Sequence, residues 1–454
     1  MKILTYNNKS ILKSILLILI LGFAQSISAQ GKRPMKLEEV IALVQQHNWD
    51  LKKMNQQIGM ADSDSRSANA AFLPSVNFTE TFTNTTDPMM AFGTKLGQSS
   101  IEQADFNPTL LNNPDNISNF NTSINIEQPL FNLDGLYGRK AALKQSEAGQ
   151  YDKAWMQKMM IIKAKSLYYQ LVLTIQAEEV MVHLKSASEA NRKVAQDLFD
   201  QGAITRADLL GAELRLKQVE SEWLRAQHQV VKVNSLLLQH MGEVEVYQID
   251  PIDPIPNIEE ANAMLVESNL SEQRADLKAI KLKAEAAGYG YQSQKGSFVP
   301  RVNAFGRYSF NDPQFLGTQA DNYLVGVQLK WDVFKGGKQI GATQKANYQK
   351  QYAQIAYEES RSRADHELQQ LKNDFELAIK QKELAELSVD QARALHQIRQ
   401  DRFAQGLEKT SDLLMDESNY MNQEMQLLKT KHGYLQLMFQ LEAATSENST
   451  DESL

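Results

Sequence analysis

The chain has 454 residues, no cysteine, and 48 basic against 55 acidic residues, which give a formal net charge of −7. Without cysteine it can form neither a disulfide nor a thiolate metal site, and its acidic balance argues against nucleic acid as a partner. The length allows two or three domains. Because Gly and Pro are sparse, with 22 and 11 residues, long helices are expected to predominate.

Residues 1–29 have the pattern of a secretory signal peptide. Three lysines precede an apolar run at residues 15–23, and small residues follow as far as Ala29. The apolar run is about half of the roughly 20 residues that a bilayer-spanning helix requires. The sequence therefore predicts cleavage after Ala29 and export from the cytoplasm.

Two copies of one unit follow the signal peptide. The segment AFLP at residues 71–74 recurs as SFVP at residues 297–300, and FDQGAITRADLL at residues 199–210 recurs as FAQGLEKTSDLL at residues 403–414. Such self-similarity is the mark of a duplicated structural unit. Each copy is predicted to run helix, strand, strand, long helix, turn and helix.

These markers divide the chain into domains. The first repeat is predicted at residues 30–246 and the second at residues 259–442, with a polar, proline-bearing linker at residues 247–258 between them. Residues 443–454 are predicted to form an acidic, disordered tail.

In each repeat a helix gives way to two strands of alternating polarity. The first helix, which begins near Leu37, should end before Pro74 because proline cannot continue it. Beyond it, Val76, Phe78 and Phe82 alternate with polar residues, which is the period of a strand. The four strands are predicted near residues 75–83, 119–128, 301–310 and 322–331.

Each strand is about ten residues long, the length of a tilted strand that crosses the hydrocarbon layer. Alternation alone leaves open a half-buried strand in a soluble sheet, and Phe305 interrupts the polar face of the third strand. Residues 84–118 are extra in the first repeat and rich in Asn, Asp, Pro, Gly and Ser. They are predicted to form one extracellular loop.

Two very long helices follow the strand pairs, near residues 138–198 and 338–402, and neither contains a proline. At 1.5 Å per residue each would be roughly 90 Å long. In the second, apolar residues fall at alternating spacings of three and four, as in a coiled-coil seam. The seam comprises Leu368, Leu371, Phe375, Ala378, Ala385, Val389 and Ala392.

Each long helix is predicted to end in a tight turn. Gly202 and Gly406 allow the positive φ that such a turn needs. Thr205 and Thr410 can cap the helix that follows, and Asp208 and Asp412 come three and two residues later, where the helix dipole favours a carboxylate.

No enzyme motif is recognisable. The seven histidines are scattered, and residues 366–370, HELQQ, have Gln370 where a zinc motif needs its second histidine. Gly288 and Gly290 do not complete a phosphate loop and are interpreted as a break between helix and strand. The sequence predicts no catalytic, cofactor-binding or metal-binding residue.

Taken together and in order, these motifs resemble the outer-membrane efflux, or TolC-like, proteins. The resemblance rests on FLP before the first strand, Pro129-Leu130-Phe131, the segment VFKGG at residues 333–337, and both F-x-x-G…D-L-L turns. It implies a mainly helical homotrimer in which three sets of four strands form a twelve-stranded membrane β-barrel within outer-membrane lipid. The long helices would form a periplasmic tunnel.

The resemblance also implies a function: a passive duct in the outer membrane of a Gram-negative bacterium, working with a periplasmic adaptor and an inner-membrane pump. Its cargo would be small molecules or, as in type I-like secretion, proteins. The alternative from the residues alone is a secreted or periplasmic structural coiled-coil protein that enters no membrane.

In relatives, an aspartate at the position of Asp412 lines the narrow periplasmic entrance, where threefold symmetry makes a ring of three carboxylates. The second acid of the relatives falls on Met415 here, with Asp416 one place later. An arginine that latches the closed entrance in some relatives aligns with Glu408. The resemblance thus implies a gate at Asp412 and Asp416, closed by a different contact.

Overall fold

The structure is a computed structural model that describes residues 32–256, 269 and 273–445. The predicted signal peptide lies outside the described residues. Within them, the chain forms two compact units. Residues 53–155 and 273–365 form the strand unit, and the described parts of residues 32–52, 156–256 and 366–445 form the helical unit.

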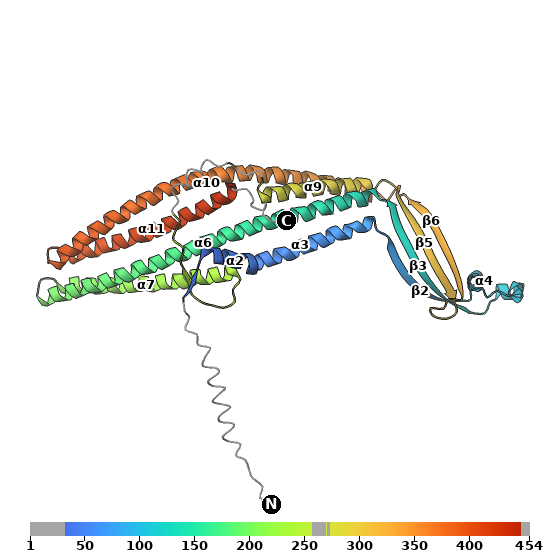
Figure 1. Cartoon of the computed structure of the whole chain (residues 1–454), viewed down its shortest axis with the longest axis horizontal. Helices are drawn as coiled ribbons and strands as arrows, with labels where there is room; N and C mark the ends of the chain where they lie inside the picture. Colours follow the sequence, from blue (N-terminus) through green and yellow to red (C-terminus); the bar gives the residue numbers. More distant parts are fainter. Residues whose placement is uncertain (1–31, 257–268, 270–272, 446–454) are drawn as a thin grey trace, which may run out of the picture. The chain divides into compact units, whose positions relative to one another are not determined.

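One antiparallel sheet of four strands, in the order β2-β3-β5-β6, dominates the strand unit (Figure 1). Its strands are β2 (Ser75–Thr85), β3 (Ile117–Phe131), β5 (Arg301–Asp312) and β6 (Ala320–Lys330). All four predicted strands are present, and β3 runs past its predicted end because Pro129-Leu130-Phe131 continue it, with a shift in register between Pro129 and Phe131.

The register gives the sheet one apolar and one polar face, because residues directly paired across antiparallel strands lie on the same face. A typical apolar row is Val76, Ile126, Gly306 and Val325. The apolar face also carries Phe78, Ile124, Val302, Ala304, Tyr308, Tyr323, Val327 and Leu329. The polar face carries Asn77, Thr79, Asn119, Asn121, Ser123, Asn125, Asn303, Ser309, Asn311, Asn322 and Gln328.

The polar face also carries large apolar residues such as Leu324 and Phe305, and the sheet makes room for Phe305 at Gly326. Phe305 and Gly326 are paired, and a Cβ added at Gly326 would lie 2.7 Å from the Phe305 ring. Only glycine leaves space for the ring at this position.

The longer helices that enter or belong to the strand unit are α3 (Trp49–Ser67), α6 (Leu133–Asp200), α9 (Ala275–Gly296) and α10 (Lys338–Ala404). The helix break predicted at Gly288 and Gly290 is wrong, since both lie inside α9. Tyr289 between them stacks on Tyr137 of α6, with ring centroids 6.4 Å apart, and Lys140 lies over both rings. This packing stabilises α9 at the two glycines, so the helix continues without a break.

The extra residues of the first repeat are more ordered than the single loop predicted. They form α4 (Pro88–Gly97), a 3-10 turn (Gln103–Phe106) and α5 (Pro108–Asn112). Asp87 caps α4, its carboxylate accepting from the Met90 N–H at 2.8 Å, and proline follows as the first helical residue. We call residues 86–116 the insertion.

In the helical unit, α6 and α10 continue and are joined by α2 (Leu37–His47), α7 (Arg206–Met241) and α11 (Thr410–Thr445). The first helix of the sequence, predicted as continuous, breaks at Asn48. The Asn48 side chain donates to the His240 carbonyl at 2.7 Å and accepts from the Asp50 N–H at 2.9 Å. The prediction failed because this break depends on a partner far away in the chain.

The predicted linker contributes structure of its own. Within it, β4 (Ile249–Pro251) pairs in parallel with β1 (Arg33–Met35). Residues 443–445 of the predicted tail are helical and close α11, while residues 446–454 lie outside the described residues.

A continuous core fills the helical unit. Tyr168 and Leu171 of α6, Leu237 of α7 and Phe375 of α10 are among its fully buried members. The coiled-coil seam predicted for α10 is confirmed, since Leu368, Phe375, Ala378, Val389 and Ala392 are buried and Leu371 packs against the core, while Ala385 is partly buried. Among the described residues, no helix combines the length and the apolar character that crossing a membrane would take.

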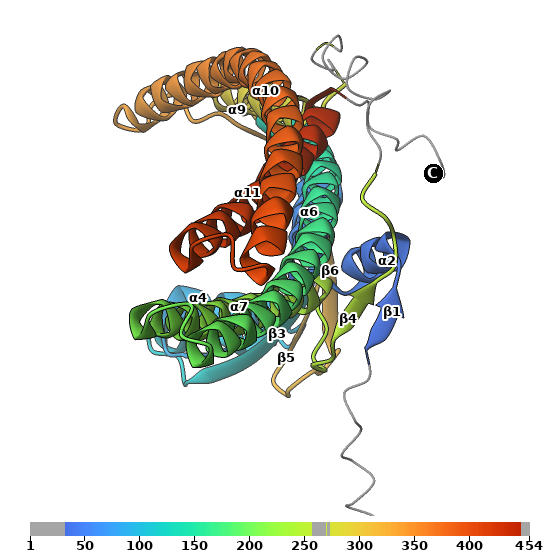
Figure 2. The same ribbon diagram turned by 90° about the vertical axis from the view of Figure 1, so that its left-hand side faces the viewer.

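The predicted order of elements is confirmed in both repeats: helix, two strands, long helix, turn and helix. Within the helical unit, α6 and α7 form one antiparallel hairpin and α10 and α11 form another (Figure 2). We call them the first and second hairpins.

Candidate functional site

The two hairpin turns have the same backbone design. Gly202 and Gly406 adopt φ values of +73° and +70°. In each turn the glycine N–H donates to the carbonyl of the phenylalanine three residues earlier, Phe199 or Phe403, at 2.9 Å. This is the closing pattern that glycine makes possible at the end of a helix.

A small shared core lies beneath both turns. It contains Ala195, Leu209 and Ala212 of the first hairpin and Phe403 and Leu413 of the second, all buried. The repeated F-x-x-G…D-L-L motif therefore has a packing role as well as a turn role. Phenylalanine and leucine anchor the turns to each other, and glycine reverses the chain.

The first turn is closed by a capping box. Thr205 Oγ1 accepts from the Asp208 N–H at 3.3 Å, and the Asp208 carboxylate accepts from the Thr205 N–H at 2.9 Å and from its hydroxyl at 2.6 Å. The hydroxyl and the N–H of Thr205 lower the pKa of Asp208. Asp208 thus has a local structural role.

The second turn is built differently, and the prediction that Thr410 caps α11 is wrong. Thr410 is buried, and its hydroxyl has no hydrogen-bond partner in the described part of the chain. The carbonyl of Lys409 instead accepts from the N–H groups of Asp412 and Leu413 at 3.1 and 3.2 Å. Among the residues that the structure describes, the Asp412 side chain accepts only from the Ser411 hydroxyl, at 3.2 Å.

The two threonines therefore differ in a measurable way. Thr205→Ala should lower the local stability of its turn by about 1 kcal/mol, because a cap is lost. Thr410→Val should be neutral or stabilising, because it removes a buried hydroxyl without a partner. Hydrogen exchange of the two turns measures both effects. A larger loss for Thr410→Val than for Thr205→Ala would contradict these roles.

The second turn carries an ion-pair network that sequence reasoning missed. Arg399 Nε lies 2.9 Å from Asp416 Oδ2, and Arg399 Nη1 lies 2.7 Å from Glu408 Oε1. Arg402 Nε is 3.1 Å from the other oxygen of Glu408. Asp416 and Glu408 are thereby paired with arginine, whereas Asp412 lies outside this network. Basic residues in the last turn of α10 were the signal that could have indicated it.

A buried polar cluster joins the two hairpins, and we call it the clasp. Glu417 of α11 is fully buried and accepts from Ser188 Oγ at 2.5 Å and Asn191 Nδ2 at 3.0 Å, both on α6. It also accepts from Arg215 Nε of α7 at 3.0 Å. The sequence signal was a carboxylate on the same stripe as the buried Leu413, four residues earlier.

Polar contacts continue along α10 and α11, on the side of the clasp that is farther from the two turns. His396 is buried and stacks on Tyr420, with ring centroids 5.7 Å apart. Burial lowers the pKa of His396, so the ring is neutral at pH 7. Arg393 donates to Glu424 at 3.0 Å. Within residues 32–256 and 273–445, no three side chains of the metal-ligating types converge on one point.

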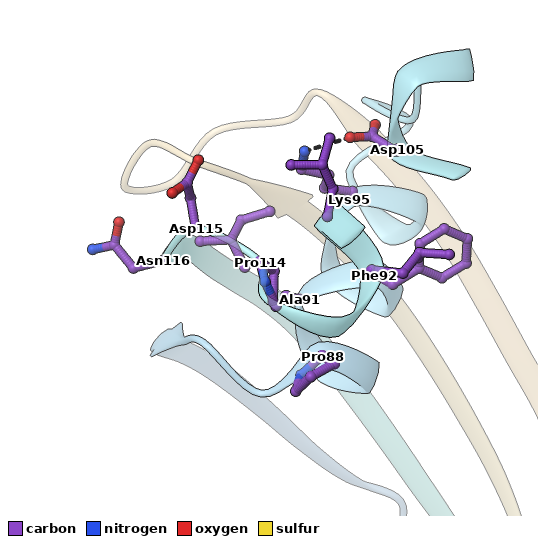
Figure 3. A pocket seen from close by; sticks show the side chains of 11 residues that line it. Pro88, Ala91, Phe92, Lys95, Asp105, Pro114, Asp115 and Asn116 are labelled. Carbon is purple, nitrogen blue, oxygen red and sulfur yellow. Dashed lines mark hydrogen bonds and ion pairs between the residues drawn. The ribbon is translucent and has the colours of Figure 1, made fainter. Parts of the chain in front are cut away.

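The insertion holds a hollow of about 280 Å³ between α4, α5 and the start of β3 (Figure 3). Lys95 and Asp105 form an ion pair of 2.7 Å on its rim. Next to it, buried Gln98 donates to Asn119 Oδ1 at 2.9 Å, and Gln319 donates to the Gln98 carbonyl at 2.9 Å. Because Asn119 belongs to the polar face, the end of α4 is attached to that face of the sheet.

Comparisons with known proteins agree with this architecture. The model of the family described as "Outer membrane efflux protein" matches residues 40–243 and 266–447. A curated relative, the alkaline protease secretion protein AprF of Pseudomonas aeruginosa, is 19% identical over 327 residues, which are 69% of this chain and 67% of the relative.

Solved structures share the fold. The CmeC outer membrane channel of Campylobacter jejuni gives a TM-score of 0.77 at 16% identity, over 91% of this chain and 87% of CmeC. The outer membrane protein VceC of Vibrio cholerae gives a TM-score of 0.75 at 17% identity, over 90% of this chain and 95% of VceC.

Proposed function

Because the chain belongs to the outer membrane efflux protein family, we propose that it is the outer-membrane channel of a tripartite export system. The observation that carries this function is the family match over both repeats, and the four-stranded sheet with one mainly apolar face agrees with it. The channel is a passive conduit and no enzyme; a periplasmic adaptor and an inner-membrane pump are its partners.

The channel is a homotrimer, and the open edges of the sheet explain why its chains must join. Within the described part of the chain, strands β2 and β6 each pair on one side only. In lipid, an unpaired edge leaves backbone N–H and C=O groups without hydrogen bonds, which costs several kcal/mol for each group. Joining the β6 edge of one chain to the β2 edge of the next closes the barrel and removes every edge.

The two faces of the sheet then have different surroundings. In membrane barrels the apolar face contacts lipid and the polar face lines the lumen. The end of α4 attaches to the polar face at Asn119, so the insertion stands at the mouth of the lumen. We place it on the extracellular side, because the opposite strand ends lead into the long helices of the periplasm.

We assign the periplasmic gate to the second turn, and within it to Asp412. Asp416 is held by Arg399, and Glu408 by Arg399 and Arg402. The Asp412 carboxylate has no such ion pair among the described residues and is therefore available to the lumen. Around a threefold axis, three such carboxylates would attract cations into the entrance. Asp416 contributes by holding Arg399 at the turn.

One recording tests both the channel and the gate. Wild-type protein in a planar bilayer should conduct, and a trivalent cation on the periplasmic side should block it. Asp412→Asn should weaken the block by about tenfold, since the carboxylate ring is lost. Asp208→Asn is the matched control and should leave the block unchanged, because Asp208 only caps its helix.

The outcomes separate the channel function from the gate. A protein that inserts into the bilayer and never conducts would contradict the channel function. Equal block of wild type and Asp412→Asn would leave the channel in place and remove the gate assignment.

The cargo is a separate question. The curated relative AprF is named for the secretion of alkaline protease. Protein secretion is therefore a second candidate beside small-molecule efflux for this chain, and the adaptor and pump that co-purify with it would distinguish the two.

A further inference from the structure

A basic hollow of about 190 Å³ lies in the strand unit where the second pair of strands meets its helices. Four cationic side chains contribute to its wall, whereas Asp332 is the only carboxylate among the described residues that line it. The cations are Arg301 at the start of β5, Lys330 at the end of β6, Lys335 in the following turn and Lys338 at the start of α10.

Two of these four charges are balanced and two are not. Lys335 pairs with Asp332 at 2.5 Å, and Arg301 donates from Nε to Asp134 at 3.0 Å. Among the described residues, neither Lys330 nor Lys338 has an ion-pair partner. The positive field reaches Asp332, whose pKa is lowered chiefly by the hydrogen bond from Lys335 and further by the charges of Lys330 and Arg301.

The register shows on which face of the sheet this charge lies. Arg301 pairs directly with Lys330, and the next residues on that face are Asn303 and Gln328. The basic pair thus continues the polar face and not the apolar one. In the proposed channel this is the face that lines the lumen.

The start of α10 adds to the same field. The chain turns through Gly336 and Gly337, with φ values of +58° and +81°, and the helix then begins at Lys338. The first N–H groups of a helix carry a partial positive charge. Lys338 and Gln339, both in the wall of the hollow, lie in this first turn.

We propose that Lys330 and Lys338, beside the paired Arg301, form an anion-binding station on the lumen wall at the junction of strands and helices, which favours cargo that bears phosphate or carboxylate groups. The inference rests on the proposed channel function, because only in a channel does the polar face line a path for cargo. Three copies would form a cationic ring. Such a ring raises the local concentration of anions in the lumen.

The test uses the full-length protein in a planar bilayer, with tripolyphosphate as the anionic probe and a potassium chloride gradient to measure ion selectivity. The double variant Lys330→Gln/Lys338→Gln should weaken block by tripolyphosphate about tenfold and shift the reversal potential toward cation selectivity. Both lysines are exposed, so the variant should fold. Lys330→Arg/Lys338→Arg keeps the charge and should keep the block.

Lys281→Gln is the matched control. It removes one exposed lysine from α9, 13 residues before Gln294 and therefore roughly 20 Å along the helix from the hollow. It should leave block and selectivity as in wild type.

Unchanged block in a conducting Lys330→Gln/Lys338→Gln channel would overturn the station while leaving the channel function intact. The station would also be overturned if wild type ignored tripolyphosphate from both sides and instead retained anionic lipid that the double variant loses, because the lysines would then bind headgroups. Failure of the proposed channel function would give a different result, because neither wild type nor any variant would conduct. That result would also rule out the station.

Discussion

Replacing Glu417 by alanine is expected to loosen the contact between the two hairpins by several kcal/mol. Glu417 is fully buried and is the common acceptor for Ser188, Asn191 and Arg215. Its removal leaves the Arg215 charge buried and unpaired. Breaking a buried ion pair in this way costs about 3–5 kcal/mol.

Hydrogen exchange around the clasp measures this loss. Because about 1.4 kcal/mol corresponds to a factor of ten, amides near Ser188, Arg215 and Glu417 should exchange roughly a hundredfold to a few thousandfold faster in Glu417→Ala. Segments of the strand unit should be unaffected.

Glu442→Ala is the matched control on the same helix. Glu442 pairs with Lys165 at 3.0 Å, but the two side chains are 47% and 22% exposed. A pair that is open to solvent contributes about 0–1 kcal/mol. Equal acceleration of exchange in Glu442→Ala and Glu417→Ala would show that the clasp stabilises the hairpins no more than an exposed ion pair does.

The sequence predicted the elements whose signals are local. Alternation of polar and apolar residues was enough to predict the strands. The absence of proline was enough to predict the long helices α6 and α10, and a glycine was enough to predict each turn. Gly202 and Gly406 have their predicted positive φ because no distant partner is needed to impose it.

Features that depend on distant partners were missed. The break at Asn48 depends on the His240 carbonyl, 192 residues away, and the clasp brings Glu417 to Arg215 across 202 residues. The similarity of the two repeats also led to a wrong prediction for the second turn. Thr205 and Thr410 occupy corresponding turns, yet one caps its helix and the other is buried.

The second large effect concerns the apolar face of the sheet. Val325 lies in the row with Val76, Ile126 and Gly306 and is 69% exposed in the isolated chain. In the proposed channel this apolar face contacts lipid. Val325→Arg should cost about 2–4 kcal/mol for each chain, as for a cation near the midplane of a bilayer. Three copies should prevent stable assembly in the membrane.

Gln328→Arg provides the matched control. It lies three residues further along the same strand but on the polar face, beside Asn303. An arginine there faces water in the lumen and should be tolerated. If Val325→Arg assembled as well as Gln328→Arg, the assignment of the two faces would be wrong.

The decisive measurement for the shared barrel is the mass of the particle extracted from outer membranes in mild detergent, because the barrel can close only by joining chains. We expect three chains per particle for wild type and for Gln328→Arg, and no stable particle of three for Val325→Arg. A wild-type particle that contains one chain and still conducts ions would show that the barrel is not shared.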